Sequence, residues 1–71
     1  MNFNDITDKE LSKATREKHG LSQLKLGDML GFKGYSANRR ISEIERGVRQ
    51  LISVRRLILL SIYIGNNNDS L

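Results

Sequence analysis

The residues of this sequence best suited to chemistry are arginines between positions 33 and 56. That segment has seven positive side chains, six of them arginine, and the two acids Glu43 and Glu45, so its net charge is +5. Arginine forms forked hydrogen bonds with phosphate and with guanine, and asparagine, present at Asn38, can bind adenine. The segment therefore favours a nucleic-acid-binding surface over an ordinary solvated one. The positive residues are Lys33, Arg39, Arg40, Arg46, Arg49, Arg55 and Arg56.

A helix from near Ser36 to Gly47 is expected to carry this surface. Ala37, Ile41 and Ile44 share one face by their spacing of four and three, and Gly47 suits a left-handed helix end. The opposite faces then present polar side chains to solvent or to a ligand. These are Asn38, Arg39, Ser42, Glu43 and Arg46.

A helix that precedes it is marked by signals at both ends. Thr7 and Glu10 match a capping box, and Ile6 and Leu11 match a hydrophobic staple. The helix is expected to run to about His19, with Gly20 as its stop.

Two more helices are predicted, giving an all-α domain. Ser22 caps one that starts at Gln23 and ends at Gly31, with Leu26 and Leu30 on its apolar face. Gly27 inside this helix costs about 1 kcal/mol relative to alanine, which predicts a close crossing with another helix. The last helix is expected from about Val54 to Ile64, capped by Ser53 and stopped by Gly65.

Composition narrows the possible functions. The chain has 71 residues, no cysteine and one histidine, so we expect one domain over residues 1–65, with 66–71 as a flexible polar tail, and no disulfide, metal or cofactor. No nucleophile–base pair, metal cluster or phosphate loop is evident, so an enzyme is not expected. The apolar run 57–64 is too short to span a bilayer and no signal peptide is evident, so a bacterial cytoplasmic or nucleoid location is expected.

The ordered motifs resemble a known family. Gly20-Leu21-Ser22-Gln23, Leu26, Leu30-Gly31 and the run from Ile41 to Gly47 resemble the phage-repressor and Cro-like (XRE-type) helix-turn-helix over roughly residues 11–65. The resemblance implies a compact, lambda-repressor-like bundle of four or five helices. It also implies a dimeric regulator that inserts the second helix of the motif into the DNA major groove.

The resemblance also implies roles for individual residues. Asn38 and Arg39 match positions that reach base edges, Arg40 lies beside them on base or phosphate, and Glu43 matches a further base-facing position. Ser36 is added because the segment after Gly31 is about four residues longer than the plain motif. The expected DNA base contacts are thus Ser36, Asn38, Arg39, Arg40 and Glu43, and the expected phosphate contacts are Gln23, Lys33, Tyr35, Arg46 and Arg49.

Two residues, Glu43 and Tyr35, keep structural alternatives. Glu43 could instead hold Arg39 or Arg46 in place. Tyr35 could pack in the core or donate its hydroxyl to a phosphate, whereas Phe32 is expected in the core. Arg16 and Glu45 match a family pair that forms a buried ion pair between the first and third helices.

The last helix has more apolar residues than one face can hold. The family pattern puts Leu57, Leu60, Ser61 and Ile64 in the core, which leaves an exposed stripe that we expect to be a homodimer interface. The alternative is a helix buried on all sides. The stripe consists of Leu59, Ile62 and Tyr63.

These observations predict a sequence-specific, dimeric repressor of its own phage or mobile-element operon, bound to a palindromic operator in double-stranded DNA. Operons that carry anti-CRISPR genes are among those that small members of this type regulate. No small-molecule effector and no membrane partner are expected. The alternative is an antitoxin-like module whose exposed stripe binds a different protein.

Overall fold

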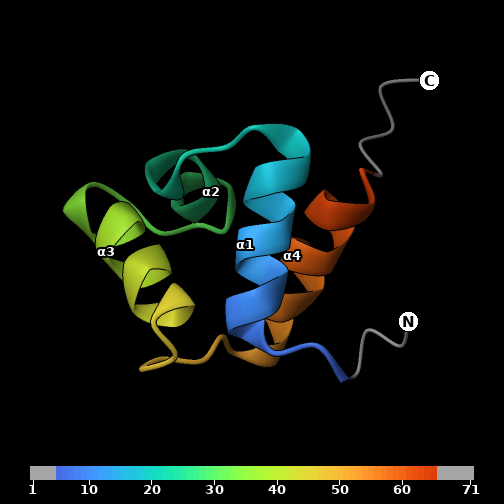
Figure 1. The fold of residues 1–71 in the computed structure, drawn as a ribbon. Helices are drawn as coiled ribbons and strands as arrows, with labels where there is room; N and C mark the ends of the chain where they lie inside the picture. Colours follow the sequence, from blue (N-terminus) through green and yellow to red (C-terminus); the bar gives the residue numbers. More distant parts are fainter. Residues whose placement is uncertain (1–4, 66–71) are drawn as a thin grey trace.

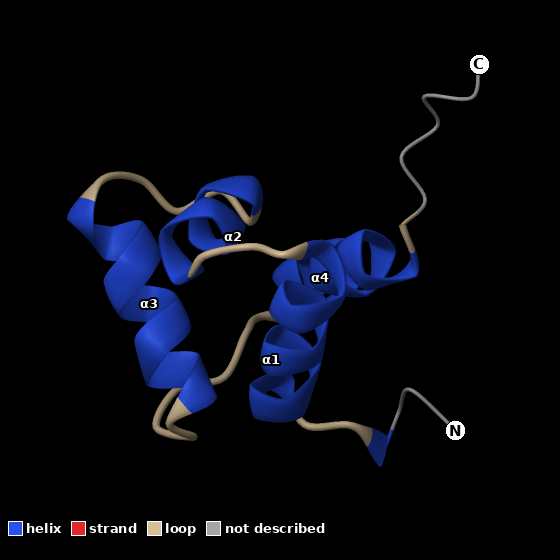
Figure 2. Cartoon of the chain, turned by 45° about the horizontal axis from the view of Figure 1, so that its top comes forward, coloured by secondary structure: helices blue, strands red, loops and turns tan. Residues whose placement is uncertain are grey.

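The computed structural model describes residues 5–65, which form four helices and no strand. The helices are α1 (Asp8–His19), α2 (Gln23–Met29), α3 (Tyr35–Glu45) and α4 (Ser53–Ile64). They pack as a bundle in which α1 contacts both α3 and α4, and α2 packs against α3 (Figure 1, Figure 2). The predicted all-α fold is confirmed. The tail predicted at 66–71 lies outside the described residues.

The start of α1 has the capping box that its sequence predicts. The backbone N–H of Glu10 donates to Thr7 Oγ1, and the backbone N–H of Thr7 donates to Glu10 Oε1, both at 3.1 Å. Each bond satisfies a donor that a helix start leaves without a partner. Ile6 and Leu11 both join the core cluster, as a hydrophobic staple requires.

Helices α2 and α3 cross where Gly27 meets Ala37. A Cβ atom at position 27 would lie 2.4 Å from the carbonyl oxygen of Ala37, well inside van der Waals contact. The glycine therefore lets the two backbones touch, which is the close crossing that its sequence position predicts.

The core is small and built from all four helices. Each helix contributes at least one fully buried apolar side chain, and half-buried neighbours, including Phe32 and Leu60, pack around them. The buried cluster consists of Leu11, Leu26, Leu30, Ile41, Ile44 and Leu59.

The predicted orientation of α4 is wrong. Leu59 is 0% exposed, and Ile62 and Tyr63 are half-buried against the core, so these three do not form an exposed stripe. Leu57, which the family pattern places in the core, is instead 66% exposed. The exposed side, which we call the outer face of α4, consists of Val54, Leu57, Ile58, Ser61 and Ile64.

Two arginines at the start of α4 explain its rotation. Arg55 Nε donates to the carbonyl oxygen of Leu30 at 2.9 Å, and Arg56 pairs with Asp8 and donates to the carbonyl oxygen of Ile6. Both guanidinium groups therefore point toward the rest of the protein. The opposite side of α4, which is its outer face, then points to solvent. The helix begins at Ser53 with Ile52 at the N-cap position, so the predicted serine cap is also wrong.

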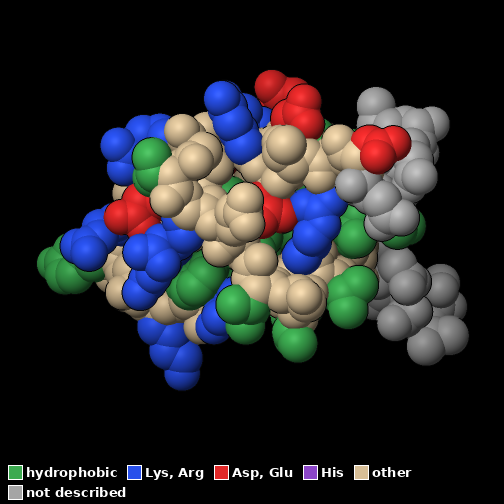
Figure 3. Space-filling view, turned by 90° about the horizontal axis from the view of Figure 1, so that it is seen from below, with side chains coloured by type: hydrophobic (Ala, Val, Ile, Leu, Met, Phe, Trp, Pro, Cys, Tyr) green, Lys and Arg blue, Asp and Glu red, His purple; other side chains and the backbone are tan. Residues whose placement is uncertain are grey.

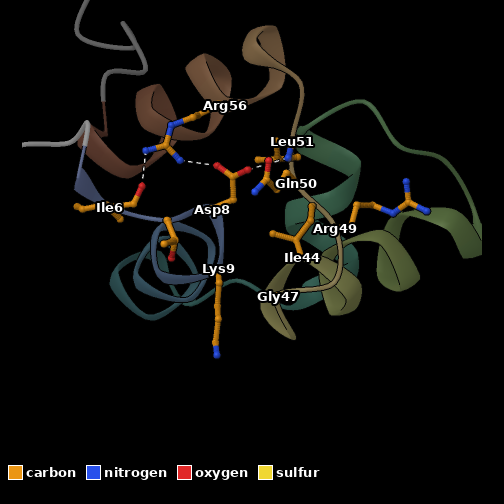
Figure 4. Close-up of a pocket in the computed structure, with 10 residues that line it drawn as sticks. Ile6, Asp8, Lys9, Ile44, Gly47, Arg49, Gln50, Leu51 and Arg56 are labelled. Atoms are coloured by element: carbon orange, nitrogen blue, oxygen red, sulfur yellow. Dashed lines mark hydrogen bonds and ion pairs between the residues drawn. The ribbon is translucent and has the colours of Figure 1, made fainter.

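Asp8 links the start of α1 to the α3–α4 connector. Its Oδ2 accepts the backbone N–H of Leu51 at 2.7 Å, while its Oδ1 pairs with Arg56 (Figure 4). One carboxylate thus fixes the connector and the start of α4 together.

Within the described residues, no helix is long and apolar enough to cross a lipid bilayer.

Candidate nucleic-acid interface

The turn before α3 sets the position of the start of that helix. The backbone N–H of Phe32 donates to the carbonyl oxygen of Gly27 at 3.0 Å, and the Phe32 ring packs against the core cluster. Gly34 then occupies the N-cap position with φ 60, a conformation that suits glycine. Tyr35, the first residue of α3, is 97% exposed, so the core alternative for this residue is excluded.

The N-terminal half of α3 presents polar side chains to solvent. Ser36 and Asn38 are exposed, and the side chain of Arg39 is 79% exposed. Ala37, Ile41 and Ile44 on the opposite side are buried, as predicted. Lys and Arg side chains gather over the side of the molecule where α3 lies (Figure 3). The helix therefore carries a basic, hydrogen-bonding outer face on a rigid support.

Glu43 pairs with two arginines on this face. Arg49 Nε lies 2.7 Å from its Oε1, and Arg39 Nε lies 3.8 Å from its Oε2. The hydrogen bond from Arg49 and the charges of Arg49, Arg39 and Arg40 lower the pKa of the Glu43 carboxyl below its ordinary value. The geometry supports the holding alternative for Glu43, with Arg49 as the partner in place of the expected Arg46.

The seven positive residues of the basic segment have different surroundings in the folded chain. Four are exposed around α3, and Arg40 is half-buried beside the Phe32 ring. Arg55 and Arg56 are half-buried and bind groups of the protein itself. The four exposed residues are Lys33, Arg39, Arg46 and Arg49. The sequence-based count of seven positive residues therefore overstates the charge that faces solvent.

Among the described residues, no group of three or more His, Cys, Asp or Glu side chains could hold a metal ion.

Comparison with known proteins agrees with this geometry. A family model described as helix-turn-helix matches residues 5–67, which include all four helices. The chain belongs to this family. It is of the phage-repressor and Cro-like (XRE) type, a family of DNA-binding regulators, and α2 and α3 are the two helices of its motif. No curated protein and no solved structure matches the chain.

In this helix-turn-helix protein, a charged network fixes the motif to α1. Arg16 Nη2 lies 2.8 Å from Glu45 Oε1, and Arg16 Nε donates to Oε2 at 2.8 Å, so the ion pair is forked. This is the pair that the family resemblance implies. Ser12 Oγ also donates to Oε2 at 2.6 Å, and Gln23 Nε2 donates to Oε1 at 3.3 Å. One carboxylate at the end of α3 therefore binds both α1 and α2.

The network decides the ionisation of Glu45. Burial alone would raise the pKa of this carboxyl, but the hydrogen bonds from Arg16, Ser12 and Gln23 outweigh that effect and keep its pKa below the ordinary value. The Glu45 carboxylate in turn raises the pKa of the Arg16 guanidinium. The pair therefore stays charged at neutral pH.

The contacts of Ser12 and Asp8 were not foreseen from the sequence. Ser12 is fully buried and Asp8 bonds to the connector, yet serine and aspartate in the first turns of a helix usually signal only capping or exposure. Gln23, expected at a phosphate, has Glu45 as its partner within the protein. His19 Nε2 lies 3.1 Å from the carbonyl oxygen of Tyr63, which agrees with a structural role.

Proposed function

We propose that the protein is a sequence-specific transcriptional repressor that inserts α3 into the major groove of double-stranded DNA. The observation that carries the proposal is the exposed row of Ser36, Asn38 and Arg39 at the N-terminal half of α3. A helix of this width fits the major groove, where asparagine and arginine distinguish adenine and guanine. Bound at a promoter, the protein would block access by polymerase.

The phosphate contacts of this proposal surround α3. Lys33 and Tyr35 lie on its N-terminal side, Arg46 and Arg49 follow its C-terminal end, and Gln23 begins α2. Such contacts set the register of the protein on DNA and release counterions, so the affinity should fall steeply as salt rises. Glu43 serves this interface by holding Arg39 and Arg49.

The outer face of α4 is the surface that we propose for homodimerisation. Four large apolar side chains there are exposed at helical spacing, with Ser61 among them and no charged residue on that face. Such a patch on a small protein usually marks a partner surface. Because α3 and α4 lie on either side of α1, pairing through α4 leaves α3 uncovered (Figure 1). A two-fold dimer would then match a palindromic operator.

The first test is DNA binding by the wild-type protein. Fluorescence anisotropy would compare the DNA upstream of its own gene with a scrambled duplex across a salt series. The native fragment should bind at least about 1,000-fold more tightly. This preference would support autoregulation, of the kind used by phage and mobile-element operons. Equal binding to both duplexes would contradict sequence specificity.

The variant Arg39→Ala tests the base contact proposed for Arg39. Loss of a forked guanine contact should weaken binding to the native fragment by about 1–3 kcal/mol and leave binding to the scrambled duplex much less affected. Lys13→Ala, which removes an exposed positive charge from α1, is the control and should change neither affinity. An equal loss for Arg39→Ala on both duplexes would make Arg39 a phosphate contact.

A second candidate function uses the same apolar face differently. An antitoxin-like protein would bind a different protein through the outer face of α4. Sedimentation of the protein, free and bound to its DNA, separates the two functions, because a homodimer that pairs through that face would argue against the antitoxin hypothesis.

A further inference from the structure

Two guanidinium groups lie against the single aromatic ring of Phe32. The Cζ atom of Arg55 is 4.3 Å from the ring centroid, and the Cζ atom of Arg40 is 6.0 Å from it. Both distances are within the range of a cation–π contact. Phe32 is half-buried in the turn before α3, so the ring is a fixed support that holds cations from two different helices.

These side chains line one hollow on the surface. It has a volume of ≈ 300 Å³ and lies between α3, the connector and the start of α4. Among the described residues, none of those that line it is an aspartate or glutamate. We call it the arginine hollow, and its polar lining consists of Arg40, Arg49, Gln50 and Arg55.

The positive charges in the arginine hollow are only partly balanced within the protein, with Glu43 as the acid that interacts with them. Arg49 is paired with Glu43, and Arg55 donates its Nε to the carbonyl oxygen of Leu30, which is neutral. Within residues 5–65, Arg40 forms no direct ion pair; its side chain lies beside the Phe32 ring, and the carboxylate of Glu43 acts on its charge from farther away. Guanidinium groups stay charged at any physiological pH, so Arg40 and Arg55 repel each other unless an anion lies between them.

We propose that the arginine hollow binds one phosphate group of the DNA backbone, held by Arg40, Arg55 and the amide of Gln50. The proposal rests on the proposed DNA-binding function. It gives Arg40, which sequence analysis placed on base or phosphate, the phosphate role. Arg39 is its neighbour on α3 and is exposed on the outer face, so a phosphate in the hollow would flank the groove that α3 occupies.

Phe32 is a positioning residue in this proposal. Its ring holds the guanidinium group of Arg55 and, at a greater distance, that of Arg40 before DNA arrives, which lowers the entropy lost on binding.

The salt dependence of binding tests the charge of the site. Arg40→Gln and Arg55→Gln should each weaken binding to the native and scrambled duplexes by the same factor, about tenfold. Each should also reduce the slope of log K against log salt by about 1, because one phosphate contact is lost. Lys13→Gln is the control and should leave the slope unchanged. Unchanged slopes for both arginine variants would overturn the proposal.

A second measurement locates the phosphate. Neutral methylphosphonate groups would replace the phosphates of the native duplex one at a time. One position should cost the wild type affinity but cost Arg40→Gln almost nothing, because the two changes remove the same contact. Among the described residues, the side chain of Arg40 has no hydrogen-bond partner and lies beside the Phe32 ring, so the fold of Arg40→Gln should be intact, and a thermal melt would verify this. Identical losses in wild type and variant at every position would contradict the assignment.

Inorganic phosphate distinguishes the two sources of the anion. If the wild type binds no duplex, the proposed function has failed, and the phosphate of DNA cannot be the ligand. A different outcome is that the wild type binds duplexes and Arg40→Gln binds them with the same affinity. If millimolar inorganic phosphate then shifts the NMR signals of the Phe32 ring, the hollow is a site for free phosphate and the DNA assignment is wrong. The proposal expects DNA binding that depends on Arg40, with only weak shifts from inorganic phosphate.

Discussion

The carboxylate of Glu45, at the end of α3, joins three helices through its hydrogen bonds. It accepts hydrogen bonds from Ser12 and Arg16 on α1 and from Gln23 on α2. These bonds exist only in the folded state, so the pKa of this carboxyl is lower when the protein is folded than when it is unfolded. As pH falls below the ordinary value of 4.5, the unfolded state takes up protons first. The stabilisation by Glu45 is therefore complete above that pH and is lost as pH falls through the folded-state pKa.

A Glu45→Gln variant tests this linkage. At pH 7 it should reduce the free energy of unfolding by about 3 kcal/mol, because the half-buried Arg16 loses its charged partner. The difference from wild type should shrink as pH falls from 5 to 3, where the wild-type carboxylate is itself protonated. Urea denaturation at several pH values would measure both effects.

The control for this experiment is Glu17→Gln, which changes an exposed carboxylate one residue from Arg16. It should change stability by no more than about 0.5 kcal/mol. A difference between wild type and Glu45→Gln that is the same at every pH would show that the network does not act through the charge of Glu45.

At the scale of single residues, the sequence predicts a contact only where a local motif or the family resemblance indicates it. Thr7 and Glu10 stand three apart before an apolar run, which is sufficient to predict their mutual bonds. Ser12 has no such signal, because only the packing of α1 against α3 shows that its hydroxyl meets Glu45. Phe32 was expected in the core, but its role as a support for two arginines depends on where α4 begins.

At the scale of elements, the helices were predictable but the orientation of α4 was not. The bounds of α1, α2 and α3 follow from caps, glycines and apolar spacing. In α4, large apolar residues occur on every side from Val54 to Ile64, so periodicity does not select a buried face. The inward bonds of Arg55 and Arg56 select it, and their acceptors lie on distant segments of the chain.

The crossing of α2 and α3 gives a prediction at the same scale. Gly27→Ala would add a methyl group 2.4 Å from the carbonyl oxygen of Ala37, so the helices must move apart. Alanine improves helix propensity by about 1 kcal/mol, but the clash should outweigh this gain and give a net destabilisation of about 1–3 kcal/mol. Thermal unfolding would measure the change.

Asp28→Ala is the matched control, since it adds alanine at the next position of the same helix but on its exposed side. It should be close to neutral. Because the crossing sets the angle of α3, Gly27→Ala should also weaken binding to the native DNA fragment. A Gly27→Ala protein more stable than wild type would show that α3 can shift without cost.

At the scale of the whole molecule, two unlike surfaces lie on different sides of one small core. The basic surface surrounds α3, and the outer face of α4 is apolar (Figure 1, Figure 3). Four side chains on that face each expose on the order of 100 Å², so a two-fold pair could bury about 800 Å² of side-chain area, which is less than stable specific interfaces bury. A dimer of this size should be weak alone and favoured on DNA, where two half-sites hold both copies together.

Leu57→Glu tests this coupling. The side chain is largely exposed in the single chain, so the substitution should preserve the fold but place a carboxylate from each copy in the contact. Dimerisation, measured by sedimentation equilibrium, should weaken on the order of 100-fold. Binding to the full palindrome should fall toward the affinity for one half-site. Leu24→Glu, at an exposed leucine of α2, should leave sedimentation unchanged. A Leu57→Glu protein that stays dimeric would assign the contact to another surface, whereas a wild-type protein that is monomeric both free and on DNA would remove pairing from the proposed function.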